Sequence, residues 1–116
     1  MSKPKDCITV VKAKAIQKKW NDNQANDIEK ATGSKDVIAV TFNIDQLQEY
    51  IDYVKSESSN QTIEKPGIRV YFAAQEKDGK ATVFFSASES DDANSANNYN
   101  IDPLNGGGGG WPPNAY

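Results

Sequence analysis

The sequence predicts a two-layer α+β fold, in which helices cover an antiparallel sheet of about three or four strands. Two stretches, 10–20 and 44–58, carry apolar residues at helical spacing. Three runs rich in β-branched and aromatic residues, 37–42, 68–75 and 80–88, have the composition of strands. Because a helix stripe and a sheet face must each be buried against another element, we expect these pieces to stack in two layers.

The first predicted helix follows a hydroxyl residue that can cap it. Thr9 can accept a hydrogen bond from a free amide of the first turn. The apolar stripe of this helix consists of Val10, Ala13, Ile16 and Trp20. The polar stretch that follows can continue as a second short helix. We expect it to end at Gly33, since glycine is common just past a helix C-terminus.

The 44–58 segment is the clearest helix of the chain. Asn43 occupies the N-cap position and Gln46 lies three residues further on, the spacing of a capping box. The apolar residues recur at steps of three and four, and they are Ile44, Leu47, Ile51 and Val54. We expect this face to cover the sheet, with Tyr50 and Tyr53 at the edge of the core.

The strongest local signal is a β-hairpin centred on Asp78-Gly79, a residue pair that suits a two-residue type I′ turn. Counting outward from this turn pairs Ala74 with Val83, Phe72 with Phe85 and Val70 with Ala87. All six residues are apolar and share one face. We therefore expect them to form the surface on which the 44–58 helix packs, while Tyr71 and Phe84 lie on the opposite face.

The chain ends in a run of five glycines, 106–110, followed by Trp-Pro-Pro. We divide the chain into an α+β domain, 1–98, and a Gly/Pro/aromatic tail, 99–116. Burial of one Trp returns less than the ordering of this tail costs, so several apolar residues must anchor it together. These residues are Ile101, Leu104, Trp111 and Tyr116. We predict a docked tail whose glycines lie flat over Trp20 or over the Tyr71/Phe84 face. A flexible tail and a loop that binds a partner or ligand are the alternatives.

Charge is distributed unevenly along a chain whose net charge is −3. Residues 1–35 hold eight Lys and four acidic residues, whereas residues 36–116 hold five basic and twelve acidic residues. Such asymmetry can steer a partner, but nucleic-acid binders are more often basic overall. We therefore predict a basic helix on an acidic body, and no nucleic-acid partner.

Cysteine usage and hydropathy bear on location. Cys7 is the only cysteine, so an intrachain disulfide and a disulfide-stabilised secreted scaffold are excluded. No run approaches the ~18 apolar residues of a membrane helix. The first residues also lack the apolar region of a signal peptide. These features predict a cytoplasmic protein that does not enter membranes.

The chain has few of the usual catalytic or metal-binding groups. It contains no histidine, which removes the commonest general base and most zinc sites. The stretch 91–102 is rich in oxygen ligands. Counted from Asp92, however, Asn97 stands where a calcium-binding EF-hand loop needs glycine and Pro103 where it needs glutamate. We therefore predict no metal, no cofactor and no catalytic residue.

Five residues are candidates for binding, namely Arg69, Tyr71, Phe84, Trp111 and Tyr116. Arg69 is the only arginine and shares a strand face with Tyr71, where its guanidinium can hold a carboxylate or phosphate by two hydrogen bonds. A structural salt bridge from Arg69 to an acidic residue of a neighbouring element is the alternative. The aromatic residues combine apolar area with, in tyrosine and tryptophan, a polar end that suits an interface.

Several strings of the sequence together carry a resemblance to a known family. "IDQLQEYIDYV", "PGIRVYF", "TVFF" and the ending "IDPLNGGGGGWPPNAY" resemble a family of small bacterial proteins of unknown function, found mainly in Bacteroidetes. The likeness spans most of the chain, and "PGIRVYF" and the Gly-rich "GWPP" ending are its most specific parts. The resemblance implies that the glycine-rich ending is native. It transfers no activity and no catalytic residue.

The sequence favours a non-enzymatic binding or interaction module. The reasons are the sparse catalytic groups and the aromatic residues gathered on one sheet face and in the tail. One alternative is a small enzyme that uses carboxylates with Arg69 and Tyr71. Another is an accessory or neutralising partner of another protein. A sheet edge can also pair with a second copy and give a dimer.

Overall fold

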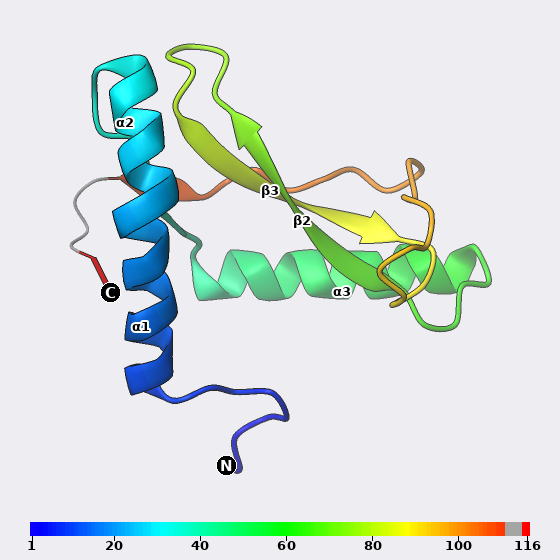
Figure 1. Ribbon diagram of the computed structural model, residues 1–116. Helices are drawn as coiled ribbons and strands as arrows, with labels where there is room; N and C mark the ends of the chain where they lie inside the picture. Colours follow the sequence, from blue (N-terminus) through cyan, green and yellow to red (C-terminus); the bar gives the residue numbers. More distant parts are fainter. Residues whose placement is uncertain (111–114) are drawn as a thin grey trace. The chain divides into compact units, whose positions relative to one another are not determined.

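The computed structural model describes residues 1–110, 115 and 116 (Figure 1). The fold is α+β, as the sequence predicts. The chain forms two compact units, Met1–Ala39 with Gly110–Tyr116, and Val40–Gly109. Each unit is defined by the contacts that its residues make with one another. The sequence-based division at residue 98, and the packing of the 10–20 helix on the sheet, stay predictions.

The first unit is built on one continuous helical rod. It consists of α1 (Val10–Trp20), the π-helical stretch η1 (Asn21–Ala25) and α2 (Asn26–Thr32). Both predicted caps are confirmed. The hydroxyl of Thr9 accepts from the backbone N–H of Lys12 at 3.1 Å. Gly33 ends α2 in the left-handed conformation, with φ +82°.

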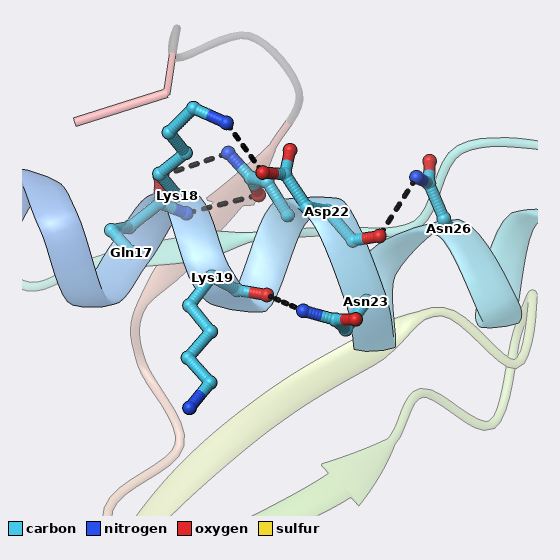
Figure 2. Close-up of polar contacts among 7 residues, drawn as sticks. Gln17, Lys18, Lys19, Asp22, Asn23 and Asn26 are labelled. Atoms are coloured by element: carbon cyan, nitrogen blue, oxygen red, sulfur yellow. Dashed lines mark hydrogen bonds and ion pairs between the residues drawn. The ribbon is translucent and has the colours of Figure 1, made fainter.

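Short polar side chains bond to the turns of this rod (Figure 2). The amide of Asn23 donates to the carbonyl of Lys19 at 2.8 Å, and that of Asn26 donates to the carbonyl of Asp22 at 3.1 Å. Lys18 also forms an ion pair with Asp22 one turn away. Side chains that donate hydrogen bonds to main-chain carbonyls compete with the backbone hydrogen bonds of the helix. They accompany the wider π turn here.

The second unit contains α3 (Ile44–Asn60), whose predicted cap is confirmed. The side-chain oxygen of Asn43 accepts from the N–H groups of Asp45 at 2.9 Å and Gln46 at 3.0 Å. The buried face differs from the predicted stripe, since it consists of Tyr50, Val54 and Ser58. The first residue of the predicted stripe, Ile44, is 80% exposed because the core begins one turn and a half further along the helix.

The strands β2 (Gly67–Ala74) and β3 (Ala81–Ser88) form the predicted antiparallel hairpin, but the predicted register is wrong by two residues. Val70 faces Phe85, Phe72 faces Val83, and Ala74 faces Ala81. The cause is a longer turn. The N–H of Gln75 donates to the carbonyl of Lys80 at 2.8 Å, which leaves four loop residues between them. Asp78 lacks the positive φ that a type I′ turn requires, and Gly79 alone of the pair has it, at +70°.

A shift of two residues leaves every side chain on its predicted face, because side chains alternate along a strand. The core of the unit consists of Tyr50, Val54, Ala87 and Ile101, with Phe85 and Leu104 packed against it. The hairpin therefore lies on α3, as Figure 1 shows. The prediction that all six apolar residues are covered is wrong. Phe72 is 86% exposed and Val70 48% exposed, because α3 packs on β3 and does not cover the outer side of β2.

A third segment lies along the other edge of β3. Phe85 and Leu104 exchange two backbone hydrogen bonds, each 2.9 Å long. The N–H of Asn98 donates to the carbonyl of Ala87 at 2.9 Å, and Ser88 forms a bridge with Asn97. Residues 97–104 thus return antiparallel to β3. In consequence β3 has backbone partners on both sides.

In place of the predicted single sheet, the described residues form two sheets of two strands each. The second sheet joins β1 (Ala39–Thr41) to β4 (Gly108–Gly110), so the glycine run supplies a strand. Nearby glycines lie against side chains. A Cβ added to Gly107 would overlap Val40 and come within 2.7 Å of the ring of Phe42.

The predicted location of the glycines is therefore corrected. Gly106 and Gly107 lie against Gln46, Val40 and Phe42, and not over Trp20 or the Tyr71/Phe84 face. The physical reason is chain direction. After Leu104 pairs with Phe85, the chain continues toward β1 along the edge of β3 that is opposite β2.

Candidate binding site

The face of the hairpin opposite the core carries three of the predicted binding residues. Arg69 and Tyr71 alternate with Val70 on β2, and Phe84 is the cross-strand partner of Tyr71. The two rings stack, with centroids 5.3 Å apart and an interplanar angle of 22°. Cross-strand aromatic pairs of this kind stabilise a hairpin and leave a flat apolar surface.

Arg69 holds the loop that follows β3. Its guanidinium donates to the side-chain oxygen of Asn97 at 2.7 Å and to the carbonyls of Ser95 at 3.0 Å and Ala93 at 3.2 Å. The predicted salt bridge is wrong for the part of the chain that the structure describes, since these acceptors are neutral. The loop residues 93–97 bring their carbonyls to the guanidinium because Asn97 is anchored on β3 through Ser88.

Asn97 links Arg69 to two tyrosines. Its amide nitrogen donates to the hydroxyl of Tyr71 at 2.7 Å and lies 3.4 Å from the hydroxyl of Tyr99. The hydrogen bond from Asn97 is the main cause that lowers the pKa of Tyr71 below its usual value of 10.0. A side-chain hydrogen bond from Arg69 and its positive charge act in the same direction, against partial desolvation.

A pocket of about 290 Å³ opens beside these groups. It is lined by Tyr71, Phe84, Ser86, Ala87, Asn97, Asn98, Tyr99, Ile101 and Pro103. We call this the Tyr71 pocket. Tyr99 stands at its rim and is 88% exposed. The volume is at the lower end of small-molecule sites, so the pocket suits one side chain or one ring. Its lining combines aromatic faces with neutral amides and with the hydroxyls of Tyr71, Ser86 and Tyr99.

The structure brings together three of the five predicted binding residues. Arg69, Tyr71 and Phe84 form one cluster. Trp111 lies outside the described residues. Tyr116 belongs to the first unit, where its N–H donates to the side-chain oxygen of Gln17 at 3.3 Å.

Sequence reasoning missed Asn97 and Tyr99. The stretch 91–102 reads as a solvated Asn-rich loop, and its polar composition gives no apolar periodicity to place it. One signal was available. Binding residues often lie on loops, and Tyr and Asn are enriched in the binding loops of antibodies.

Two further hollows lie away from this cluster. In the first unit a cavity of about 220 Å³ is lined by residues that include Trp20, Asn21, Ile28 and Val37. In the second unit an apolar groove of about 920 Å³ runs between α3 and the start of β2, with Ile51, Val54, Ile63, Pro66 and Ile68 in its lining. We call it the α3 groove.

Within residues 1–110 and 115–116 there is no group of three or more Cys, Asp or Glu side chains placed to hold a metal ion. Over the same residues, none of the helices has both the length and the apolar character needed to cross a bilayer.

Comparison of the chain with protein-family models, with curated proteins and with solved structures gives no match. The fold class alone does not imply a function, so the geometry of the site is the basis for one.

The lowered pKa of Tyr71 gives a testable pH dependence. We expect Tyr71 to ionise at lower pH than an unperturbed tyrosine, and Asn97→Ala to move its pKa upward, because the main donor to the phenolate is lost. Since the folded-state pKa lies below 10.0, the contribution of Tyr71 to stability grows as pH rises through that pKa. Absorbance titration near 295 nm of the wild type, Tyr71→Phe and Asn97→Ala measures this. If the titration curves of the wild type and Tyr71→Phe were identical below pH 10.0, the lowered pKa of Tyr71 would be contradicted.

Tyr50 serves as the internal control of that titration. It is buried, and burial raises its pKa above 10.0, with the neighbouring Tyr53 and Asp102 acting in the same direction. We therefore expect Tyr50 to ionise after Tyr71. Its contribution to stability is present below pH 10.0 and is lost as pH rises through its folded-state pKa, the opposite sign to Tyr71.

Proposed function

We propose that the protein is a non-enzymatic interaction module that binds a segment of another protein in the Tyr71 pocket. The observation that carries this proposal is the stacked Tyr71 and Phe84 pair with the amide of Asn97 beside it. Tyrosine supplies contact area at a low cost in conformational entropy, and Asn and Ser supply adaptable hydrogen bonds. The exposed ring of Tyr99 at the rim extends that surface.

The hydrogen bonds of Arg69 favour this proposal over the alternative of a small enzyme. The guanidinium already donates to Asn97 and to two loop carbonyls, so it acts as a support for the loop. The described lining of the Tyr71 pocket includes no carboxylate that could act as a general base. An accessory or neutralising role toward another protein is compatible with the same surface.

Preorganisation is a second reason to favour binding. Arg69 and Asn97 tie the loop to the sheet through hydrogen bonds of 2.7 to 3.2 Å. A loop that is already held loses less conformational freedom when a partner binds. The pocket size suits one anchoring side chain of the partner, in the manner of an interface hot spot.

The test is affinity capture from native lysate with the wild type and Tyr99→Ala. Tyr99 is chosen because its exposed side chain can be removed with little effect on folding. Tyr116→Ala is the matched control, since Tyr116 is also an exposed tyrosine but belongs to the first unit. We expect a partner that the wild type and Tyr116→Ala retain and Tyr99→Ala loses. Equal recovery by all three proteins would refute binding at the Tyr71 pocket. Truncation at residue 98 is unsuitable, because it removes Ile101 from the core.

Three further expectations remain proposals. We propose self-association through the edge of β2 that no described strand pairs with, supported by the exposed apolar residues of β2. We propose a cytoplasmic location, supported by the single, exposed Cys7. Membership of the bacterial family that the sequence resembles is likewise a proposal.

A further inference from the structure

The outer edge of β2 carries backbone groups that pair with no other strand among the residues the structure describes. The bond from Gln75 to Lys80 closes the hairpin, so alternate residues from Gln75 backward direct their N–H and C=O groups toward β3. The residues between them direct these groups to the other edge, and they are Ile68, Val70, Phe72 and Ala74. Among the described strands, β3 alone is paired with β2. An edge of this kind can be extended by another strand.

The same residues carry the largest exposed apolar side chains of the sheet. Phe72 is 86% exposed, Val70 48% and Ile68 39%. Single exposed apolar residues are ordinary, but three on one unpaired strand edge form a continuous patch that an association site would use. Proteins often block edge pairing with a proline or with a charged side chain on the exposed face. Within Ile68–Phe72 there is no proline, and the charged residue, Arg69, projects to the opposite face.

We infer that two copies of the chain form a closed dimer by antiparallel pairing of their β2 strands, with Val70 opposite Val70 of the second copy. When a strand pairs antiparallel with its own copy, Ile68, Val70 and Phe72 of the two copies meet only in registers where the paired residue numbers have the same parity. One register alone places each of the three exposed residues opposite another of the three. In it Ile68 faces Phe72 of the second copy, and Phe72 faces Ile68 of the second copy.

The α3 groove explains why this register fits. Ile68 lines the groove, and its side chain lies on the same face of the sheet as Val70 and Phe72. The paired register places the exposed ring of Phe72 of the second copy beside Ile68, next to this apolar hollow. Twofold symmetry repeats the contact, so each copy inserts one ring and receives one. The surface is thus self-complementary.

The buried area indicates a weak dimer. A large aromatic side chain buries about 150–250 Å², and a specific interface needs about 1,200 Å² in total. The two Phe72 rings, with the smaller Val70 and Ile68, supply roughly half of that area. The two strand backbones and the groove rims must supply the rest. We therefore expect association at high protein concentration, with the mass of a dimer as its limit.

Disulfide formation tests the register. In a Cys7→Ser background, which removes the native exposed thiol, Val70→Cys places two thiols at the twofold axis. Directly opposed residues have Cα atoms about 5.5 Å apart, within disulfide range. Ala74→Cys is the matched control, since it lies on the same edge but far from its own copy in this register. We expect a cross-linked dimer from Val70→Cys under mild oxidation and none from Ala74→Cys. Equal cross-linking of both variants would overturn the inference.

Sedimentation equilibrium of the unmodified chain and Phe72→Lys gives an independent reading. We expect a reversible monomer–dimer equilibrium for the wild type and a dissociation constant roughly 30-fold higher for Phe72→Lys. A chain that stays monomeric while Phe72→Lys lowers its Tm would show that Phe72 is covered within its own chain, and would overturn the inference. Open-ended growth beyond a dimer would also overturn it. This dimer deepens the proposed self-association and does not use the Tyr71 pocket, so Tyr99→Ala should leave it unchanged.

Discussion

Replacement of Ile101 by alanine should lower the free energy of unfolding by about 2–5 kcal/mol. Ile101 is 2% exposed and belongs to the core with Tyr50, Val54 and Ala87, so truncation removes buried methyl groups and leaves a cavity. Domains of this size are stable by only about 5–15 kcal/mol. The variant should therefore unfold at much lower urea concentration, which circular dichroism at increasing urea measures.

Ile44→Ala is the matched control for Ile101→Ala. Ile44 is 80% exposed, so the same chemical change should alter stability by no more than about 0.5 kcal/mol. A small effect at Ile101, similar to that at Ile44, would mean that the segment after residue 98 does not belong to the core.

Replacement of Gly107 by alanine should destabilise the protein by about 1–3 kcal/mol. The added Cβ would overlap Val40 and approach the ring of Phe42 to 2.7 Å, so strand β1 or the glycine run must move. Urea denaturation of the variant measures the loss. The result would show that Gly107 is needed for the close contact with Val40 of β1.

Gly108→Ala provides the comparison for Gly107→Ala. A Cβ at Gly108 would meet only the carbonyl of Thr41 at 3.9 Å, which is an ordinary contact. Because alanine has fewer unfolded conformations than glycine, this variant should be neutral or more stable by about 0.4–1 kcal/mol. Equal effects of the two substitutions would contradict the packing of Gly107 on Val40 and Phe42.

The helices were predictable because their signals are local. Thr9, Asn43 and Gly33 each determine a helix end through bonds to residues within one turn, and all three were confirmed. The buried face of α3 was less predictable. It depends on which turns meet β3, and this selected Tyr50 and left Ile44 exposed.

The hairpin shows which part of a pairing the sequence determines. The alternation of apolar residues fixed the face of each side chain, and this survived a register error of two residues. The register itself depends on the loop. Asp78-Gly79 suggested a two-residue turn, whereas the bond between Gln75 and Lys80 makes a four-residue loop.

The candidate site was predictable only for the residues on the two strands, because side chains alternate between the two faces of a strand. Arg69, Tyr71 and Phe84 share a face by alternation, so their proximity followed from the strands. Asn97 reaches them because it pairs with Ser88 at the end of β3, although its loop has no strong preference for helix or strand. Nothing short-range in the sequence specifies that contact. The same reasoning explains why the expected partner of Arg69 was wrong. The pattern of charged residues in a sequence cannot indicate that an arginine will donate to a neutral loop carbonyl.

The second partner of β3 has a consequence for biosynthesis. Ile101 and Leu104 complete the core from the far edge of β3, so the unit cannot reach its final stability before these residues have been made. Domains often fold from the N-terminal side as the chain emerges. Here the edge of β3 opposite β2 lacks its backbone partner until residues 97–104 have been made, so we expect α3 and the hairpin to gain their final stability only late in synthesis.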